Sequence, residues 1–326
     1  MVRGLIVALT FCTFVAGAAA SSRQQAFCGD PVWAPNGHAL AFTRITESGD
    51  RAIFRIGLDG KGERRLSGES GYAYEPVWSP DGRAIAYGTF DRAAIVHIVV
   101  ARANGGSPRG LATLGWEREP PTIFLSWSPD GKELAYVGGD GGLYAVNIDG
   151  PSGERLVARG ANEPAWSPAD RRIAYVVDVG IVVADASGAD AKVITTGGAF
   201  PAWSPNGKQI AYEERSGTNV HVMNADGTND RVVDRDGSIP QWSPDGRHLV
   251  DFTQPRNHAH AKVHVVDLRS GRVRVVTHDR SADDTQPRFS PNGKMVAFTS
   301  ATSGGSVIRL VRADGRGERT LTSCRR

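Results

Sequence analysis

The stretch PVWSPDGRAIAY, residues 76–87, decides the fold because it joins a tight corner to the strand that follows it. Pro80 presets the backbone angle at the second position of the turn, and Gly82 accepts the left-handed conformation needed to re-enter a hairpin. Residues 84–89 then alternate in a way that indicates a short β-strand. Taken alone, the stretch predicts one corner of an antiparallel hairpin.

The same corner occurs seven times along the chain, at intervals of 37 to 49 residues. The copies begin near Pro31, Pro76, Leu125, Pro164, Pro201, Pro240 and Pro287, and their aromatic position holds Trp33, Trp78, Trp127, Trp166, Trp203, Trp242 and Phe289. A second corner, containing glycine, follows within each unit. A repeat of about 40–45 residues is typical of a β-propeller blade. The sequence therefore predicts an all-β fold, a seven-bladed β-propeller of four-stranded antiparallel blades over residues 30–323.

Burial explains why the unit is repeated. A four-stranded sheet of about 40 residues cannot bury both of its faces, but it does so when it packs between similar sheets around an axis. The repeated Trp and the Ile/Leu-Ala-aromatic run after each corner are therefore expected to form the core between blades. Trp116 is the one Trp that lies outside the repeat.

Two units depart from the pattern. The fourth reads SPADRR and has no Gly at its corner, and the sixth has Asp251 where the others have Phe or Tyr. Because Phe252 comes one residue late, we expect a bulge or a shifted strand in the sixth unit.

The string PxWSPDGxxIAY, followed by an Asp-Gly corner and by RRLS at 64–67 or RTLT at 319–322, resembles the Pro-Asp (WD40-like) propeller repeat of the TolB-like family. The resemblance covers nearly all of residues 30–323. It implies the propeller fold and, by analogy only, a scaffold role in the cell envelope. The chain resembles a stand-alone propeller, without the N-terminal domain of TolB-type proteins or the hydrolase domain of related peptidases, since it contains no G-x-S-x-G string.

Residues 1–20 are predicted to be a signal peptide. Arg3 is followed by an apolar segment at 4–16, and Ala18-Ala19-Ala20 fits a small-x-small cleavage site. We expect cleavage after Ala20, a short N-terminal segment at 21–29, and export to the periplasm or the extracellular medium. An uncleaved N-terminal anchor is the alternative. The sequence predicts no transmembrane segment, because no later stretch approaches 18 apolar residues.

Two cysteines remain once Cys12 leaves with the signal peptide. Cys28 precedes the first unit and Cys324 follows the last. Every other pair of neighbouring units is joined by a chain connection, so a Cys28–Cys324 disulfide would replace the connection that a closed ring lacks. Export makes oxidation plausible. The alternative is two free thiols near the chain ends.

Composition and charge narrow the class of partner. The chain is 40% hydrophobic and 22% charged, which is ordinary for a folded protein, and its net charge is +3. Because no run of five Lys or Arg occurs, we expect no nucleic-acid partner. We expect a monomer whose ligand is a protein or peptide of unknown identity.

The residues that do not repeat are the candidates for binding. The acids Glu75, Glu119 and Glu163 lie at or near the start of a unit, on the face that carries the connections between units. Trp116 and Arg118 lie on the longest of these connections, at 115–124, and an aromatic beside an Arg is typical of an interface anchor. The alternatives are that the acids are turn caps and that Trp116 folds back onto the ring.

Histidines gather in the sixth unit. His258, His260 and His264 share one parity, so on a continuous strand they would point the same way, with Asp251 or Asp283 as a carboxylate partner. That arrangement could contribute to a divalent metal site, but His258 and His260 are expected in a loop, where a solvated polar segment is the default; we therefore expect no cofactor, with a divalent metal as the alternative. The main prediction is a non-enzymatic binding propeller; the alternative is a propeller lyase or carbohydrate-active enzyme with a metal or acid site in the channel.

Overall fold

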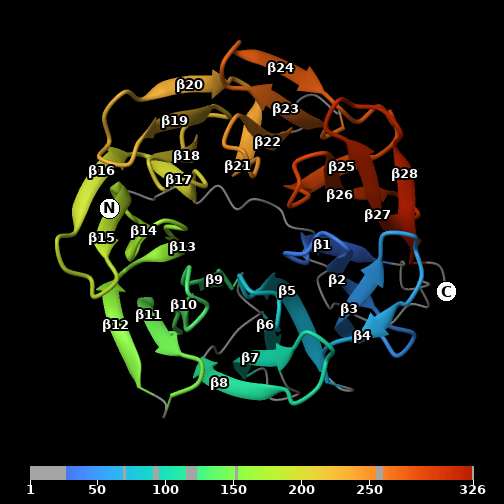
Figure 1. Ribbon diagram of the computed structural model, residues 1–326, viewed down its shortest axis with the longest axis horizontal. Coiled ribbons are helices and arrows are strands. Elements are labelled where there is room, and N and C mark those ends of the chain that lie inside the picture. Colours follow the sequence, from blue (N-terminus) through green and yellow to red (C-terminus); the bar gives the residue numbers. More distant parts are fainter. Residues whose placement is uncertain are drawn as a thin grey trace, which may run out of the picture.

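Seven four-stranded antiparallel sheets surround a central axis in the computed structural model (Figure 1). The structure describes residues 27–68, 71–90, 95–114, 123–150, 153–254 and 260–324. Within each sheet the strands follow one another in chain order; the first lies nearest the axis and the fourth lies on the circumference. The predicted seven-bladed all-β propeller is confirmed. In the described part of the chain, no helix is long and apolar enough to cross a membrane.

The blades are numbered along the chain, and their strands have these bounds. Blades 1 to 3 comprise β1 (Cys28–Trp33), β2 (Ala39–Ile45), β3 (Arg51–Gly57), β4 (Arg64–Arg65); β5 (Tyr72–Trp78), β6 (Ala84–Phe90), β7 (Val96–Arg102), β8 (Arg109–Leu114); β9 (Ser126–Trp127), β10 (Glu133–Val137), β11 (Gly142–Asn147) and β12 (Glu154–Arg159). Blades 4 and 5 comprise β13 (Asn162–Trp166), β14 (Arg172–Val177), β15 (Gly180–Asp185), β16 (Lys192–Thr196); β17 (Gly198–Trp203), β18 (Gln209–Glu214), β19 (Val220–Asn224) and β20 (Arg231–Asp234). Blades 6 and 7 comprise β21 (Gly237–Trp242), β22 (His248–Thr253), β23 (Val263–Asp267), β24 (Arg272–Val275); β25 (Asp283–Phe289), β26 (Met295–Thr302), β27 (Gly305–Arg312) and β28 (Arg319–Ser323).

The Ser-Pro-Asp-Gly corner is held by the serine as well as by its Pro and Gly. The Ser79 hydroxyl donates to Asp81 Oδ1 at 2.6 Å and accepts the Ala84 N–H at 2.9 Å. Gly82 has φ 69°, the left-handed conformation expected for it. Blade 4 closes its corner without the glycine, because the Ser167 N–H still donates to Arg172 O at 2.9 Å.

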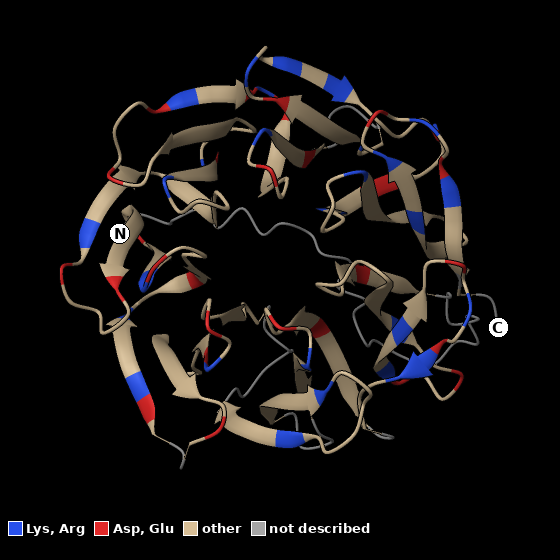
Figure 2. Cartoon of the chain, in the orientation of Figure 1, with Lys and Arg blue, Asp and Glu red and all other residues tan. Residues whose placement is uncertain are grey.

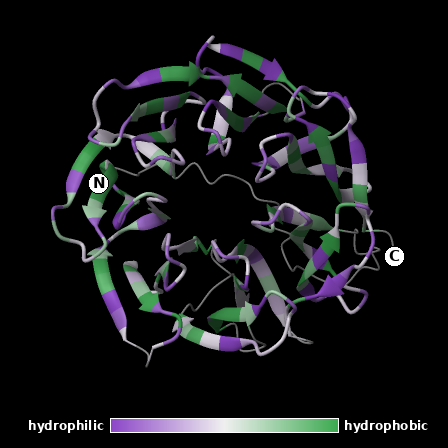
Figure 3. Ribbon diagram, in the orientation of Figure 1, coloured by the Kyte–Doolittle hydropathy of each residue, from purple (hydrophilic) through white to green (hydrophobic). Residues whose placement is uncertain are grey.

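The repeated Trp ties neighbouring blades together. The indole N–H of Trp203 donates to Ala165 O of the preceding blade at 2.9 Å, and that of Trp242 donates to Ala202 O at 2.9 Å. Trp33 makes the same bond across the ends of the chain, to Arg288 O of blade 7 at 3.0 Å. These Trp rings pack in hydrophobic clusters between neighbouring blades. The connecting loops are largely hydrophilic (Figure 3). The expected role of the Trp in blade packing is therefore confirmed for these seams.

Blade 1 packs directly on blade 7, and a Cys28–Cys324 disulfide joins them, with 6.0 Å between the two Cα atoms. The Cys28 backbone N–H also donates to the Ser306 hydroxyl at 3.0 Å, and that hydroxyl donates to Cys28 O at 2.8 Å. One hydrophobic cluster runs across this seam and includes both cysteines. The predicted disulfide is confirmed as the clasp of the ring.

Each outermost strand carries at least one Lys or Arg (Figure 2). These strands present unpaired backbone groups to solvent, and charged side chains on an edge strand oppose pairing with another chain. The basic circumference is thus accounted for by protection of the seven exposed edges.

Asp251 does not shift the strand that carries it, so the strand shift expected there is wrong; the bulge of blade 6 lies instead between Ser238 and Gln241 of β21. β22 pairs with β23 in unbroken register, with Asp251 opposite His264. Leu249 and Val250 face Trp242 and Gln241, as Ile85 and Ala86 face Trp78 and Val77 in blade 2. Asp251 therefore occupies the aromatic position itself, and Phe252 simply follows it.

Candidate functional site

A ring of unusual backbone conformations lines the axis. The residue before the strand proline has positive φ, between 50° and 55°, in six blades: Asp30, Glu75, Glu163, Phe200, Ile239 and Gln286. In each of these blades the pairing of the first two strands shifts register at this residue, which marks a β-bulge. A non-glycine residue in this conformation costs about 1–3 kcal/mol. Its recurrence means that the surrounding contacts hold it in place.

Contacts between blades show that these residues form a ring. The Gln286 amide donates to Asp30 Oδ1, and the Asp30 N–H donates back to Gln286 Oε1 at 3.0 Å. The Phe200 N–H donates to Glu163 Oε2. The Phe200 ring also lies 6.2 Å, centroid to centroid, from Phe124, which precedes Leu125 in blade 3. The ring is therefore acidic at blades 1, 2 and 4 and apolar at blades 3, 5 and 6.

Burial sets the electrostatics of the acidic part. Burial raises the pKa of Glu163 to about 7, although the Phe200 N–H and the charge of Arg215 oppose the rise. Burial, and then the charge of Asp30, raise the pKa of Glu75 well above its ordinary value. Burial also lowers the pKa of Arg288, against the attraction of Asp30. Buried carboxylates of this kind are receptive to a positive charge.

The pKa of Glu163 predicts a pH dependence of stability. Between pH 4.5 and 7 the folded chain keeps this proton while the unfolded chain loses it, so the stabilisation present below pH 4.5 is lost as the pH rises through 7. Glu163→Gln is neutral throughout. Its melting temperature should match that of the wild type at pH 5 and exceed it by about 2–4 °C at pH 8.

Differential scanning calorimetry at the two pH values checks this. The exposed Glu47→Gln is the matched control and should show the same difference from wild type at both. An advantage of Glu163→Gln that does not grow with pH would contradict the assignment.

The structure brings together only some of the predicted binding residues. Glu75 and Glu163 are both members of the ring, in the left-handed position. Trp116, Arg118 and Glu119 lie outside the described residues, so the predicted interface loop stays a prediction.

The predicted metal-binding histidines have different surroundings. His258 lies outside the described residues. His260 is exposed, and its Nδ1 lies 3.2 Å from Asp283 Oδ1. His264 is buried, with Nδ1 2.8 Å from Asp234 Oδ2 and 3.7 Å from Asp251 Oδ1. Asp251, named as a possible partner, thus lies beside His264, whereas Asp283 pairs with His260.

The acids around His264 are buried at the seam between blades 5 and 6. The carboxylate of Glu213 accepts hydrogen bonds from the Ser238 hydroxyl at 2.6 Å and from the Ile239 N–H at 3.1 Å. Burial raises the pKa of Glu213, and burial together with the charges of Asp234 and Glu213 raises that of Asp251 well above its ordinary value. Burial and the proximity of the acids to one another therefore make the charged forms of Glu213 and Asp251 unfavourable.

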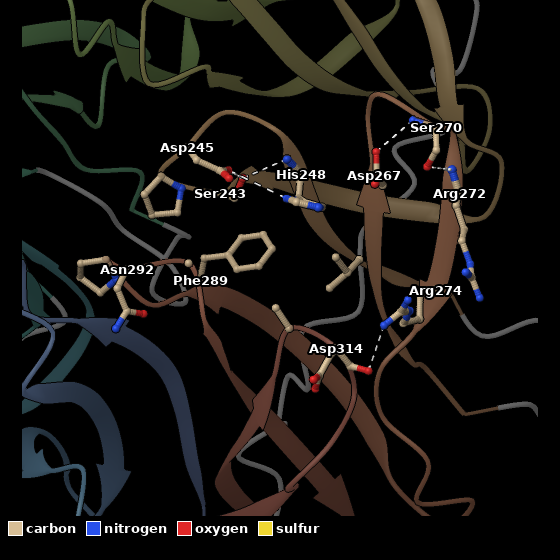
Figure 4. Close-up of a pocket in the computed structure, with 15 residues that line it drawn as sticks. Ser243, Asp245, His248, Asp267, Ser270, Arg272, Arg274, Phe289, Asn292 and Asp314 are labelled. Atoms are coloured by element: carbon tan, nitrogen blue, oxygen red, sulfur yellow. Dashed lines mark hydrogen bonds and ion pairs between the residues drawn. The ribbon is translucent and has the colours of Figure 1, made fainter.

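A groove of about 790 Å³ opens on the opposite face, at the seam between blades 6 and 7 (Figure 4). Its walls come from the corner of blade 6, from β23 and β24, and from the corner of blade 7; they include Asp245, His248, Asp267, Arg272, Arg274, Phe289, Asn292 and Asp314. Phe289 stands where the other blades have Trp. It has no indole N–H to donate to the preceding blade, and its smaller ring fills less of this seam.

Three features of the sites were not predicted from the sequence. The bulge lies at the residue before the strand proline, but the positive φ of that residue cannot be inferred from a single sequence. Phe289 is the exception at the repeated Trp position, but the groove that it lines was not predicted. Asp234 was not singled out at all, because it lies one blade before Asp251 and only the ring packing brings the two together.

Comparisons with known proteins agree with the fold. A family model described as "TolB beta propeller domain" (PD40) matches residues 11–181 and 126–325. The curated protein "Tol-Pal system protein TolB" of Azoarcus sp. (strain BH72) is 34% identical over 67 residues. That match spans 21% of this chain and only 15% of the length of the Azoarcus protein.

Two solved structures share the architecture. An oligogalacturonate lyase in complex with manganese has a TM-score of 0.71 at 14% identity, covering 88% of this chain and 90% of its own. TolB from Acinetobacter baumannii has a TM-score of 0.57 at 18% identity, covering 91% of this chain and 63% of its own. At these identities the likeness shows the fold alone.

Proposed function

The chain belongs to the TolB beta propeller domain (PD40) family, and from this premise we propose that it is an exported, non-enzymatic propeller that binds a cationic segment of a protein partner at the ring of left-handed residues around its central axis. The observation that carries the proposal is the ring of left-handed residues, in which Asp30, Glu75 and Glu163 present carboxylates beside apolar side chains. A peptide with a basic residue next to an apolar or aromatic one fits this arrangement.

Charge supports a cationic ligand. Within the described residues, none of these three carboxylates forms an ion pair within 4 Å, although Glu75 and Glu163 have raised pKa values. Arg215 near Glu163 and Arg288 near Asp30 lie farther away than an ion pair, and a partly buried carboxylate without a close counter-charge is unfavourable when ionised. A Lys or Arg from a partner would compensate that charge and would gain a strong, charge-assisted hydrogen bond.

Shape and position support a protein or peptide rather than a small molecule. The apolar part of the ring is formed by Phe124, Phe200 and Ile239, next to the acids. The connections that lead into the first strand of each blade lie on this same face; Trp116 and Arg118, on one of these connections, are outside the described residues. Aromatic side chains such as those of Phe124 and Phe200 are enriched at protein interfaces.

Export rests on the N-terminal sequence. The apolar segment at 4–16 and Ala18-Ala19-Ala20 support a cleaved signal peptide, and a disulfide clasp is suited to an oxidising compartment. N-terminal sequencing of the protein purified from its natural host should read from Ser21. A chain that keeps residues 1–20 would contradict cleavage.

The binding proposal is tested by affinity capture from envelope extracts. Glu75→Gln combined with Glu163→Gln keeps the shape and removes the two carboxyl groups that a bound cation would hold in the ionised form. It should reduce recovery of the partner at least about tenfold, because leaving a buried cation of the partner unpaired costs more than about 1.4 kcal/mol. Asp81→Asn combined with Asp130→Asn is the matched control, since these acids lie at corners on the other face.

The control should capture the partner as well as the wild type does. Equal recovery by the Glu75/Glu163 variant, or an equal loss in the control, would contradict binding at the ring.

A further inference from the structure

At one core position of the propeller, a carboxylate replaces the aromatic side chain that the other blades have. The residue at this register position of the second strand is buried and aromatic in six blades: Phe42, Tyr87, Tyr136, Tyr175, Tyr212 and Phe298. In blade 6 it is Asp251, which is 0% exposed. The neighbouring Gly237 makes room for it, since a Cβ there would lie 2.8 Å from Asp251 Cγ. The carboxylate is thus held in a slot that elsewhere holds apolar side chains.

Asp251 has no hydrogen-bond partner in this slot. Within the described part of the chain, neither of its carboxylate oxygens is paired, and both are shielded from solvent. The approach to His264 Nδ1, at 3.7 Å, is longer than a hydrogen bond. A buried carboxyl group left unpaired is costly in both forms.

The neighbours of Asp251 are residue types that bind metal ions. Asp234, from the outermost strand of blade 5, and His264, opposite Asp251 on β23, are each at least nine-tenths buried. One ligand atom from each of the three residues lies within 4.8 Å of the others. The nearby Lys262 is engaged elsewhere, donating to Ala282 O at 2.6 Å and pairing with Asp284 at 3.3 Å.

We propose that Asp234, Asp251 and His264 bind a divalent first-row transition metal ion, such as Zn²⁺ or Mn²⁺, at the seam between blades 5 and 6. Two carboxylates and an imidazole suit such an ion, whereas Ca²⁺ prefers oxygen ligands alone. Ligand atoms around an ion with bonds of about 2.0–2.2 Å lie about 3–4 Å apart. The distances of 2.8 Å and 3.7 Å from His264 Nδ1 are close to that range.

The ion would connect blade 5 to blade 6 and compensate the buried negative charge. His264 Nδ1 would give up its proton and bind the metal in place of its hydrogen bond to Asp234. The ion replaces, at this seam, the aromatic packing that the other blades use. This inference is independent of partner binding at the ring of left-handed residues.

The test is metal binding by the full-length mature protein after treatment with a chelator. Isothermal titration with Zn²⁺ should give one equivalent bound and a rise in melting temperature, with much weaker binding of Ca²⁺. Asp251→Asn keeps the shape and removes the charge, and it should bind Zn²⁺ at least about a hundredfold more weakly, since loss of a ligand exceeds the effect of an outer-shell change.

Two further variants make the result decisive. Asp251→Phe restores the aromatic residue of the other blades; it should be folded by circular dichroism and bind no Zn²⁺ at this seam. His260→Gln removes an exposed histidine outside the cluster and should bind as the wild type does.

The proposal is overturned if the wild type takes up no more Zn²⁺ than Asp251→Phe, which would mean that only water or a proton occupies the slot. It is equally overturned if Asp251→Asn binds as tightly as the wild type. Loss of binding in His260→Gln alone would place the metal outside the cluster.

Discussion

Replacing Cys28 and Cys324 together by serine should lower the free energy of unfolding by up to about 5–6 kcal/mol, the largest effect that we expect from any pair of substitutions. The two cysteines are 296 residues apart, so the disulfide restricts nearly the whole unfolded chain. It also anchors the only seam of the ring that no peptide connection spans. Without it, blade 1 is held to blade 7 by packing and by bonds such as Trp33 to Arg288 O.

Urea denaturation of the oxidised wild type and of the variant measures the difference. The wild type under reducing conditions is the matched control and should unfold at the same urea concentration as the variant. A variant that stays within about 1 kcal/mol of the oxidised wild type would show that the seam does not need the clasp.

Trp203→Ala should destabilise the protein by about 3–5 kcal/mol, the range for truncating a large buried aromatic side chain. The Trp203 ring is buried between blades 4 and 5, its N–H donates to Ala165 O at 2.9 Å, and the Arg172 guanidinium lies 4.9 Å above it. Truncation leaves a cavity at the seam and an unpaired carbonyl.

Trp203→Phe separates the two contributions, because it keeps an aromatic ring and loses the hydrogen bond; it should cost about 1–2 kcal/mol. Blade 7 already has Phe289 at this position, so the fold accepts the exchange. Equal destabilisation by the two variants in thermal or urea denaturation would show that the hydrogen bond, and not the packing, matters.

Most of the fold was predictable because each unit repeats the same local solution. The corner around Gly82 and the following strand are determined by neighbouring residues. Because the pattern occurs seven times, the prediction does not depend on any single copy. The ring closure was predictable for a related reason: Cys28 and Cys324 lie where every other unit has a connection. The disulfide was predicted from the positions of the two cysteines relative to the repeated units, and not from the residues around them.

The candidate sites were less predictable because they depend on contacts between blades. Asp251 is recognisable in the sequence as a departure from the repeated aromatic residue, but the strand shift expected there is wrong. The strand keeps its register, and the Asp251 carboxylate is buried at the aromatic position. Its neighbour Asp234 belongs to the preceding blade. Glu75 and Glu163 are recognisable as candidate binding acids in the sequence. Their common place in the ring of left-handed residues depends on a β-bulge that the local sequence does not predict.

The most direct test of the proposed function is photo-cross-linking in the natural host, with benzoylphenylalanine placed at Phe200 or at Phe289. Phe200 belongs to the ring of left-handed residues around the axis, and Phe289 lines the groove on the opposite face (Figure 4). We predict a cross-linked protein partner at Phe200 and none at Phe289. A partner that cross-links at Phe289 and not at Phe200 would contradict binding at the ring of left-handed residues.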